Sequence, residues 1–259
     1  MRRPSLLCLS GHDPTGGAGV HADIEAAGAQ GIPALSIITA LTVQDSGNVH
    51  LVRSVDPDLI ERQLQVLVAD ADIHAIKIGL LGDAALVPLL ASWIDRLGVP
   101  AVLDPVLRAG GGAELAGSRL QEAIVRDLLP RVTLATPNAA EARRLAGLPA
   151  GAPADPAGAA LIAGGCANVL VTGGDEVTND IPAVVNTWHR RDGAPHVYTW
   201  PRLPETFHGA GCTLASAIAA RLVLGEPLAV ALDTAQRWTQ ASLARAFAIG
   251  RGRRIPGRR

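Results

Sequence analysis

A cysteine stands directly after a Gly-x-Gly turn in the stretch TFHGAGCTLASAIAARL (206–222), where a helical pattern begins. The first N–H groups of a helix have no partner within it, so those of Ala210, Gly211, Cys212 and Thr213 could converge on an anion. We expect the helix dipole to lower the pKa of the Cys212 thiol and to favour the thiolate. The alternative is a small buried apolar residue, and the local sequence leaves both interpretations open.

Oxygen-bearing side chains form a second candidate site. Asp104 ends an apolar run, and Asn138 and Glu141 stand three residues apart where another apolar run gives way to a helical pattern. Carboxylate and amide oxygens suit Mg²⁺ held on phosphates, with Glu141 orienting a water on the metal. The alternatives are a capping box, with Asn138 as N-cap and Glu141 at N3, and a solvated turn at Asp104.

The elements that must position these groups alternate between short apolar runs and longer helical patterns. We expect strands over residues 6–10, 34–39, 74–79, 100–104, 132–136 and 168–173. We expect helices over residues 19–30, 57–70, 84–97, 118–129, 138–147, 211–224 and 227–247. Such alternation predicts an α/β fold, with a mostly parallel central sheet and helices on both of its faces. Residues 183–200 are expected to form a short antiparallel hairpin, and residues 147–159 a surface loop.

Glycines, carboxylates and amides follow these strands, at the edge where an open parallel sheet binds its ligands. They occur in residues 11–19, 40–47, 79–83, 104–112, 136–142 and 172–176. This pattern predicts a functional cleft at that edge. Gly17, Gly19 and Ala22 fit G-x-G-x-x-A, but the fingerprint of a nicotinamide site needs its first glycine directly after the strand. The sequence contains no Walker A motif, so a nucleotide kinase would have to hold phosphate in another way.

The composition limits the classes of partner. The chain has 259 residues, 48% of them hydrophobic and 3% aromatic, and its formal net charge of −1 favours neither nucleic acid nor a membrane surface. Its three cysteines form no metal or disulfide pattern, and no apolar run is long enough to span a bilayer. We therefore expect a cytoplasmic protein. Residues 1–250 should form one domain and the basic residues 251–259 a flexible, solvated tail, with an anion-binding arm as the alternative.

In their order and spacing, these motifs resemble those of the hydroxymethylpyrimidine/phosphomethylpyrimidine kinases of thiamine biosynthesis, which belong to the ribokinase-like superfamily. The resemblance covers about residues 5–250. It rests on GHDPTGGAGVHADIEA (11–26), ITALTVQD (38–45), DPVLRAGGG (104–112), TPNAAEA (136–142), TGG (172–174) and HGAGCTLASAIAARL (208–222). It implies a three-layer α/β/α fold, a homodimer, and the use of ATP and Mg²⁺. The implied substrates are 4-amino-5-hydroxymethyl-2-methylpyrimidine and then its monophosphate.

The same resemblance assigns roles to individual residues. The pyrimidine site would be formed by Gly11, Asp23, Gln44, Leu80 and Val106. The catalytic turn and anion hole would be formed by Gly209, Ala210, Gly211 and Cys212. The Cys212 side chain would accept the proton of the hydroxymethyl group. ATP would be bound by Arg108, Thr172, Gly174 and Thr213, and magnesium by Asp104, Asn138 and Glu141.

Two departures from the family pattern concern the charge that meets ATP. Thr172 stands where better-known members carry a lysine before paired glycines, and a lysine is also usual after the DPV stretch. Arg108 could supply the missing charge, whereas Lys77 lies in an expected strand and is a poor substitute. Three other functions stay open: a pyridoxal or pyridoxine kinase, a non-catalytic pyrimidine-binding module, and a nicotinamide-dependent dehydrogenase.

Overall fold

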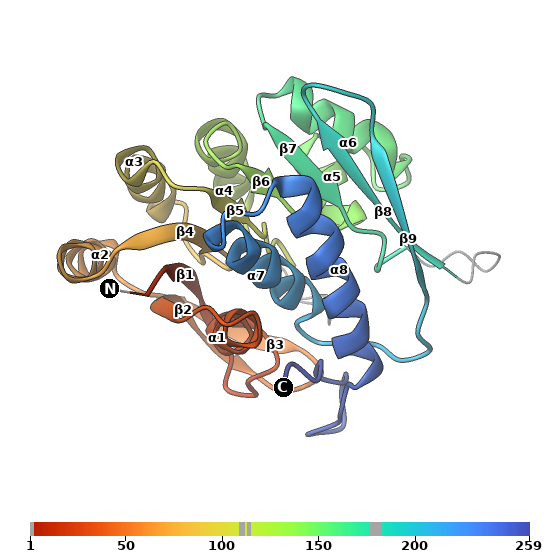
Figure 1. The fold of residues 1–259 in the computed structure, drawn as a ribbon, viewed down its shortest axis with the longest axis horizontal. Coiled ribbons are helices and arrows are strands. Elements are labelled where there is room, and N and C mark those ends of the chain that lie inside the picture. The colour runs from red at the N-terminus through yellow and green to blue at the C-terminus, as the bar shows by residue number, and fades with distance from the viewer. Residues whose placement is uncertain (1–2, 109–111, 113–114, 177–182) are drawn as a thin grey trace.

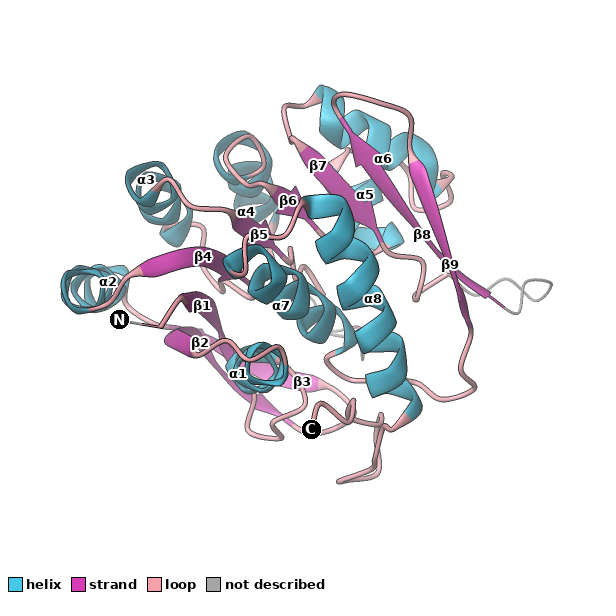
Figure 2. Cartoon of the chain, viewed as in Figure 1, coloured by secondary structure: helices cyan, strands magenta, loops and turns pink. Residues whose placement is uncertain are grey.

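A computed structural model describes residues 3–108, 112, 115–176 and 183–259. The strands of the described chain form one sheet in the order β3-β2-β1-β4-β5-β6-β7-β8-β9 (Figure 1). Helices cover both faces of this sheet, and Figure 2 shows them as an outer layer on either side of the strands. The predicted three-layer α/β/α fold with a mostly parallel central sheet is confirmed.

Six strands form the parallel centre of the sheet. They are β1 (Ser5–His12), β2 (Ala34–Gln44), β4 (Ile73–Ile78), β5 (Ala101–Leu103), β6 (Leu134–Ala135) and β7 (Asn168–Val171). Antiparallel strands border them on both sides: β3 (Val49–Ser54), β8 (Ala183–Arg190) and β9 (His196–Pro201). The β8–β9 pair confirms the hairpin expected near residues 183–200.

Side chains of the parallel strands alternate between two cores. In β1, Leu7 and Leu9 enter one core, while Leu6 and Cys8 enter the other. The first core is covered by α2 (Pro57–Asp70), α3 (Leu86–Leu97), α4 (Ser118–Ala123) with the π-helical turn Ile124–Leu128, α5 (Ala139–Leu145) and α6 (Ala154–Ala163). The second is covered by α1 (Gly19–Ala29), α7 (Ala210–Val223) and α8 (Leu228–Ala244). Burial on both faces explains why these strands are short, continuous apolar runs.

Local signals in the sequence set the ends of some helices. The Asp56 side chain accepts a hydrogen bond of 2.9 Å from the N–H of Asp58, and Pro57 occupies the first helical position of α2. Proline suits that position because its missing N–H would have no helical partner there. None of the helices among the described residues has the length and apolar character needed to cross a bilayer.

Three sequence expectations are corrected. The second strand does not end at residue 39; it runs to Gln44 and pairs with β3, which was not expected. The loop expected at 147–159 contains the start of α6, whose sequence ADPAGAALIA has a proline in the first turn. A proline is tolerated there because the N–H groups of a first turn need no helical acceptor.

The basic tail is the third correction, because residues 251–259 fold back onto the domain instead of extending into solvent. Ile255 is buried, and backbone hydrogen bonds join Arg254 to Thr206 and His208. Arg258 is only 2% exposed. Its guanidinium donates to the Thr213 hydroxyl at 2.8 Å, and also to the carbonyl oxygens of Gly16 and Gly17 and to the Glu25 carboxylate.

We predict that Arg258→Ala lowers the free energy of unfolding by about 3 kcal/mol, because buried acceptors lose a charged donor. Arg259→Ala is the matched control. The Arg259 side chain is exposed, and of the four groups that accept from Arg258 it hydrogen-bonds only to the Glu25 carboxylate. Urea unfolding followed by circular dichroism measures both variants. Equal midpoints for Arg258→Ala and the wild type would show that the tail adds nothing to the fold.

Candidate active site

A cleft of about 730 Å³ lies at the carboxyl ends of the parallel strands. All the expected site residues except Asp23 and Thr213 line it. The glycine-rich residues 109–111 of the 104–112 stretch lie outside the described residues. The cleft also extends over a region that sequence reasoning missed, lined by Val184, Asn186, Trp200, Gln236, Thr239, Gln240 and Leu243.

The turn that opens α7 is held by close backbone contact. Gly209 has φ +81°, and a Cβ at this position would collide with the Gly17 carbonyl, so only glycine fits. Ala210, Gly211 and Cys212 line the cleft from the first turn of the helix. Their N–H groups form the end of a helix dipole, which is an arrangement that attracts anions.

Thr213 does not share in this arrangement, which corrects its expected role at ATP. Its N–H donates to the Gly209 carbonyl at 2.9 Å, and its hydroxyl donates to the same carbonyl at 2.7 Å. The hydroxyl also accepts from Arg258. The side chain is fully buried, so Thr213 supports the turn from behind.

The ionisation of Cys212 is the opposite of what the sequence suggested. Burial raises the pKa of its thiol to about 12, against the attraction of Lys77, and the carboxylates of Asp104 and Asp23 also raise it. The helix start is therefore present, but desolvation and negative neighbours outweigh its dipole. In the free protein Cys212 is a neutral thiol at pH 7.

A buried ion pair lies beneath the cleft. The ammonium of Lys77, on β4, is 2.7 Å from a carboxylate oxygen of Asp23, on α1, and neither side chain is exposed. The Ser216 hydroxyl donates to the same carboxylate at 2.6 Å, and Lys77 donates to the Ser10 hydroxyl at 3.0 Å. Burial acts to lower the pKa of Lys77, but the charge of Asp23, the charge of Asp104 and the hydrogen bond to Asp23 act together to raise it overall, so the lysine stays charged.

This pair corrects the expected role of Asp23 at the pyrimidine. Its carboxylate is held below the surface by Lys77 and Ser216. It is absent from the cleft lining, whereas its partner Lys77 does line the cleft. Lys77 is already paired with Asp23. It is therefore a poor substitute for the lysine that the family pattern has at the position of Thr172, as expected from the sequence.

The proposed magnesium residues meet at the start of α5. The Asn138 side chain accepts from the Glu141 N–H at 2.9 Å, and Glu141 accepts from the Asn138 N–H at 3.0 Å, so the capping box is present. The second Glu141 oxygen accepts from the Leu107 N–H at 3.1 Å. Burial, and then the Asp104 charge, raise the pKa of Glu141 to about 8.

Near Glu141, the Asp104 carboxylate has an oxygen that is available to bind a ligand. Its Oδ2 atom is buried and has no hydrogen-bond partner among the described residues. Burial raises the pKa of Asp104 despite the nearby charge of Lys77. The described residues contain no cage of three or more acidic, histidine or cysteine side chains. One open carboxylate, backed by Glu141, fits a magnesium ion that keeps most of its waters and binds through phosphates.

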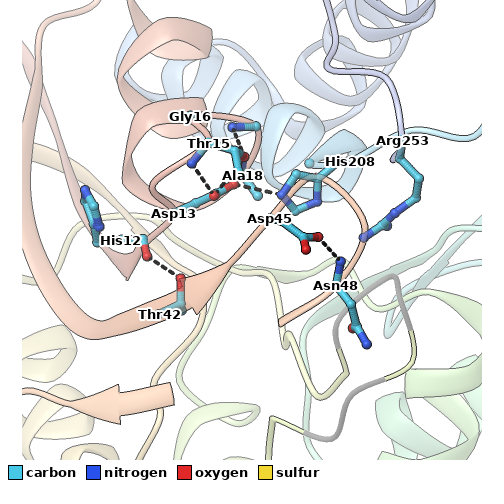
Figure 3. Close-up of polar contacts among 12 residues, drawn as sticks. His12, Asp13, Thr15, Gly16, Ala18, Thr42, Asp45, Asn48, His208 and Arg253 are labelled. Atoms are coloured by element: carbon cyan, nitrogen blue, oxygen red, sulfur yellow. Dashed lines mark hydrogen bonds and ion pairs between the residues drawn. The ribbon is translucent and has the colours of Figure 1, made fainter. Parts of the chain in front are cut away.

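A buried pair that sequence reasoning missed joins the first loop to the anion turn. Nε2 of His208 lies 2.7 Å from Oδ2 of Asp13, although the residues are 195 positions apart in the chain (Figure 3). Asp13 also accepts from the N–H groups of Thr15 and Ala18. Burial acts to raise the pKa of Asp13, but the hydrogen bonds and the His208 charge lower it overall. Both residues stood in motifs noted in the sequence, and only the fold brings them together.

The part of the cleft lined by residues of β8, β9 and α8 combines one aromatic side chain, Trp200, with the polar side chain of Gln236. The Gln236 side-chain oxygen accepts from Asn186 at 2.8 Å and from the Trp200 indole at 3.1 Å. Thr172 also lines the cleft; its backbone bonds Pro137 and Ala139, and the N–H of the next residue, Gly173, donates to the Asn186 side chain. The Trp200 side chain suits stacking on a flat aromatic ring.

Comparisons with known proteins agree with this geometry. A family model described as phosphomethylpyrimidine kinase matches residues 13–256. The hydroxymethylpyrimidine/phosphomethylpyrimidine kinase of Salmonella typhimurium is 35% identical over 260 residues, which cover 97% of this chain and 96% of that protein. A thiamine biosynthesis multifunctional protein of Corynebacterium efficiens is 35% identical over 258 residues; the match covers 97% of this chain but only 34% of that longer protein.

Two solved structures resemble the whole chain. The pyridoxal kinase of Bacillus subtilis, in an ADP complex, gives a TM-score of 0.87 at 26% identity and covers 98% of this chain and 96% of its own. A phosphomethylpyrimidine kinase of Clostridium difficile gives a TM-score of 0.79 at 26% identity, with 92% of this chain and 99% of its own covered.

We predict that Lys77→Met destabilises the protein by about 3–5 kcal/mol, because it leaves the Asp23 carboxylate buried without its partner. The double variant Lys77→Met/Asp23→Asn removes both charges and should be more stable than Lys77→Met alone. Urea unfolding of the wild type, of each single variant (Lys77→Met and Asp23→Asn) and of the double variant gives the coupling free energy. Strictly additive losses would contradict a paired role for these residues.

Proposed function

We propose a function from one premise: the chain belongs to the phosphomethylpyrimidine kinase family. It is a phosphotransferase that uses ATP to phosphorylate 4-amino-5-hydroxymethyl-2-methylpyrimidine and its monophosphate in thiamine biosynthesis. The observation that carries this conclusion is the position of the Gly209–Cys212 turn in the cleft. It lines the same cleft as the loops expected to bind the pyrimidine and as Trp200, whose indole suits stacking on a nucleobase.

The pyrimidine half is proposed to be formed by Gly11, Gln44, Leu80 and Val106. Gln44 is the last residue of β2 and lines the cleft, where its amide can meet ring nitrogens and an amino group. Gly11 lies against the Leu80 side chain, since a Cβ there would come within 2.8 Å of it. A larger residue at position 11 would therefore narrow a slot that suits a flat ring.

ATP would lie along the other half, with Thr172, Gly174 and Arg108 near its phosphates. Arg108 lines the cleft and donates to the Gly112 carbonyl at 3.1 Å. Asp104, supported by Glu141 and Asn138, would hold Mg²⁺, which supplies charge neutralisation at the phosphates when bound. The N–H groups of Ala210, Gly211 and Cys212 would stabilise the charge that develops on the transferred group.

In the first phosphorylation, Cys212 is proposed to accept the proton of the hydroxymethyl group as that oxygen attacks the terminal phosphorus of ATP. The new oxygen–phosphorus bond forms as the bond to ADP breaks, and the proton passes to the Cys212 sulfur. Because the free thiol is neutral, the reactive thiolate is a minor form at pH 7. The first phosphoryl transfer should therefore become faster as the pH rises. In the second, an ionised phosphate oxygen of the monophosphate attacks instead, so no proton has to pass to Cys212.

We also propose a cytoplasmic homodimer that needs magnesium. The cysteines Cys8, Cys166 and Cys212 are all unpaired and buried, as suits a reducing compartment. The β2–β3 hairpin leaves Leu41, Val43 and Leu51 half-exposed, which a second copy could cover. Sedimentation velocity separates a dimer from a monomer.

The function is tested by incubating the purified protein with ATP and one acceptor at a time: the hydroxymethylpyrimidine, its monophosphate or pyridoxine. We expect ADP release and phosphorylated products by mass spectrometry for both pyrimidines. A pyridoxal kinase is the second candidate, favoured by the TM-score of 0.87, and it would phosphorylate pyridoxine faster. Binding of the pyrimidine without ATP consumption would identify a non-catalytic binding module instead.

For Cys212→Ala we predict a kcat for the unphosphorylated pyrimidine lower by about 10²- to 10⁴-fold, the usual contribution of a positioned acid or base. In the wild type, kcat/KM for the unphosphorylated pyrimidine should rise about tenfold per pH unit between pH 7 and 9, since a thiol with a pKa near 12 in the free protein gains thiolate at that rate. The variant should lose this slope. Cys166→Ala is the control, and a few-fold loss with a flat wild-type profile would restrict Cys212 to lining the anion hole.

A further inference from the structure

The second substrate of the proposed reaction carries a phosphate monoester, whose charge near pH 7 is about −1.5 to −2. A cation in the pyrimidine half of the cleft would strengthen its binding beyond what the backbone N–H groups of the anion turn provide. Lys77 is paired with Asp23, and Arg202 donates to the carbonyl oxygens of Gly173, Gly174 and Glu176 at the opposite end. Arg108 also lines the cleft, but it donates to the Gly112 carbonyl and is proposed to meet the ATP phosphates. Arg253 lines the cleft near the first loop, where Figure 3 shows it beside His208, the partner of Asp13.

The backbone around Arg253 is fixed in place. The Arg253 N–H donates to the Ser46 carbonyl at 3.0 Å, and the Gly252 N–H donates to the Ser46 hydroxyl at 3.0 Å. On its other side, Arg254 pairs with Thr206 and His208. The segment therefore joins the β2–β3 turn, which follows Gln44, to the loop that leads into the anion turn.

The guanidinium of Arg253 bridges the same two loops with weak contacts. Nη1 lies 3.4 Å from the Phe207 carbonyl, and Nη2 lies 3.4 Å from the Gly47 carbonyl. Nε is buried and has no hydrogen-bond partner in the described part of the chain. Because these hydrogen bonds are long and the Nε donor is unused, the Arg253 guanidinium can donate to two oxygens of an anionic ligand.

The neighbouring carboxylate does not neutralise this cation. Asp13 is committed to His208, Thr15 and Ala18, and Figure 3 shows Arg253 on the far side of His208 from Asp13. Burial lowers the pKa of Arg253, with the Asp13 charge acting only in the opposite direction. A desolvated guanidinium without a bound carboxylate gains more from an anionic ligand than a solvated one does.

We infer that Arg253 binds the phosphate of the monophosphate substrate and so determines the preference for the second phosphorylation over the first. This inference rests on the proposed pyrimidine kinase function. The unphosphorylated pyrimidine offers no anion to the guanidinium, so Arg253 should matter far less for the first reaction. Arg253 is thus a specificity-determining residue contributed by the basic tail.

The test compares kcat/KM for the two acceptors in Arg253→Gln, Arg253→Lys and the wild type. For Arg253→Gln we expect kcat/KM for the monophosphate, divided by kcat/KM for the unphosphorylated pyrimidine, to fall about 10- to 100-fold. This is the usual loss when a charged hydrogen-bond donor is removed. Arg253→Lys keeps the positive charge but loses the planar arrangement of N–H donors, so the ratio of the two kcat/KM values should be intermediate. Arg254→Gln is the matched control, because that exposed side chain donates only to the Ala246 carbonyl among described groups.

An unchanged ratio in Arg253→Gln, whether both values fall together or neither falls, overturns the inference. Calorimetric titration of each pyrimidine into the ATP-free protein separates this result from a failure of the proposed function. If the wild type consumes no ATP, the kinase proposal fails, but a selective loss of monophosphate affinity in Arg253→Gln still supports the site. Equal monophosphate affinity in wild type and Arg253→Gln overturns it. Circular dichroism of each variant confirms that the fold is kept.

Discussion

The ion pair between Lys77 and Asp23 is the constraint on which the shape of the cleft depends. Two fully buried charges are tolerated where each offsets the other and further hydrogen bonds assist them. Ser10 and Ser216 supply such bonds, although Oδ2 of Asp23 has no hydrogen-bond partner among the described residues, and the pair connects β1, β4, α1 and α7 at one point. Because the first loop leaves β1 and the anion turn opens α7, this point fixes the distance between two walls of the site.

A second set of contacts, nearer the surface, holds the loops that those elements carry. Asp13 and His208 join the first loop to the anion turn, and Gly209 packs directly on Gly17. The tail then ties both to the β2–β3 turn through Arg253 and to Thr213 through Arg258. The loops that would bind the pyrimidine and the phosphoryl group are therefore one cross-linked unit, although they come from four distant parts of the chain. Such preorganisation is what electrostatic stabilisation of a transferring group requires.

The sequence predicted the features that depend on local pattern. Strand and helix alternation, the helix over residues 57–70 and the β8–β9 hairpin all follow from residues near one another in the chain. The helix α6 was missed because it contains Pro156 and Gly158, and packing of Ala157 and Leu161 stabilises it. The strand β3 was missed although its residues favour a strand, because it lies at the sheet edge and has no fully buried residue. The positions of Asp23 and Thr213, and the folded tail, could not be foreseen because each depends on a partner more than forty residues away. The motif at residues 206–222 predicted where the anion turn lies. It did not predict the burial that keeps the Cys212 thiol protonated.

Burial is the main cause of the protonation state of the acids on the floor of the free cleft. It raises the pKa of Asp104, of Glu141 and of the Cys212 thiol, and neighbouring carboxylates add to this effect, while the charge of Lys77 opposes it at Asp104 and Cys212. A cleft in this state disfavours an isolated anion and favours one that arrives with compensating cations. The anion turn alone would not hold a nucleotide against such a floor. The proposed use of magnesium with the nucleotide, and of Arg253 with the phosphorylated acceptor, answers the same electrostatic requirement at the two ends of the cleft.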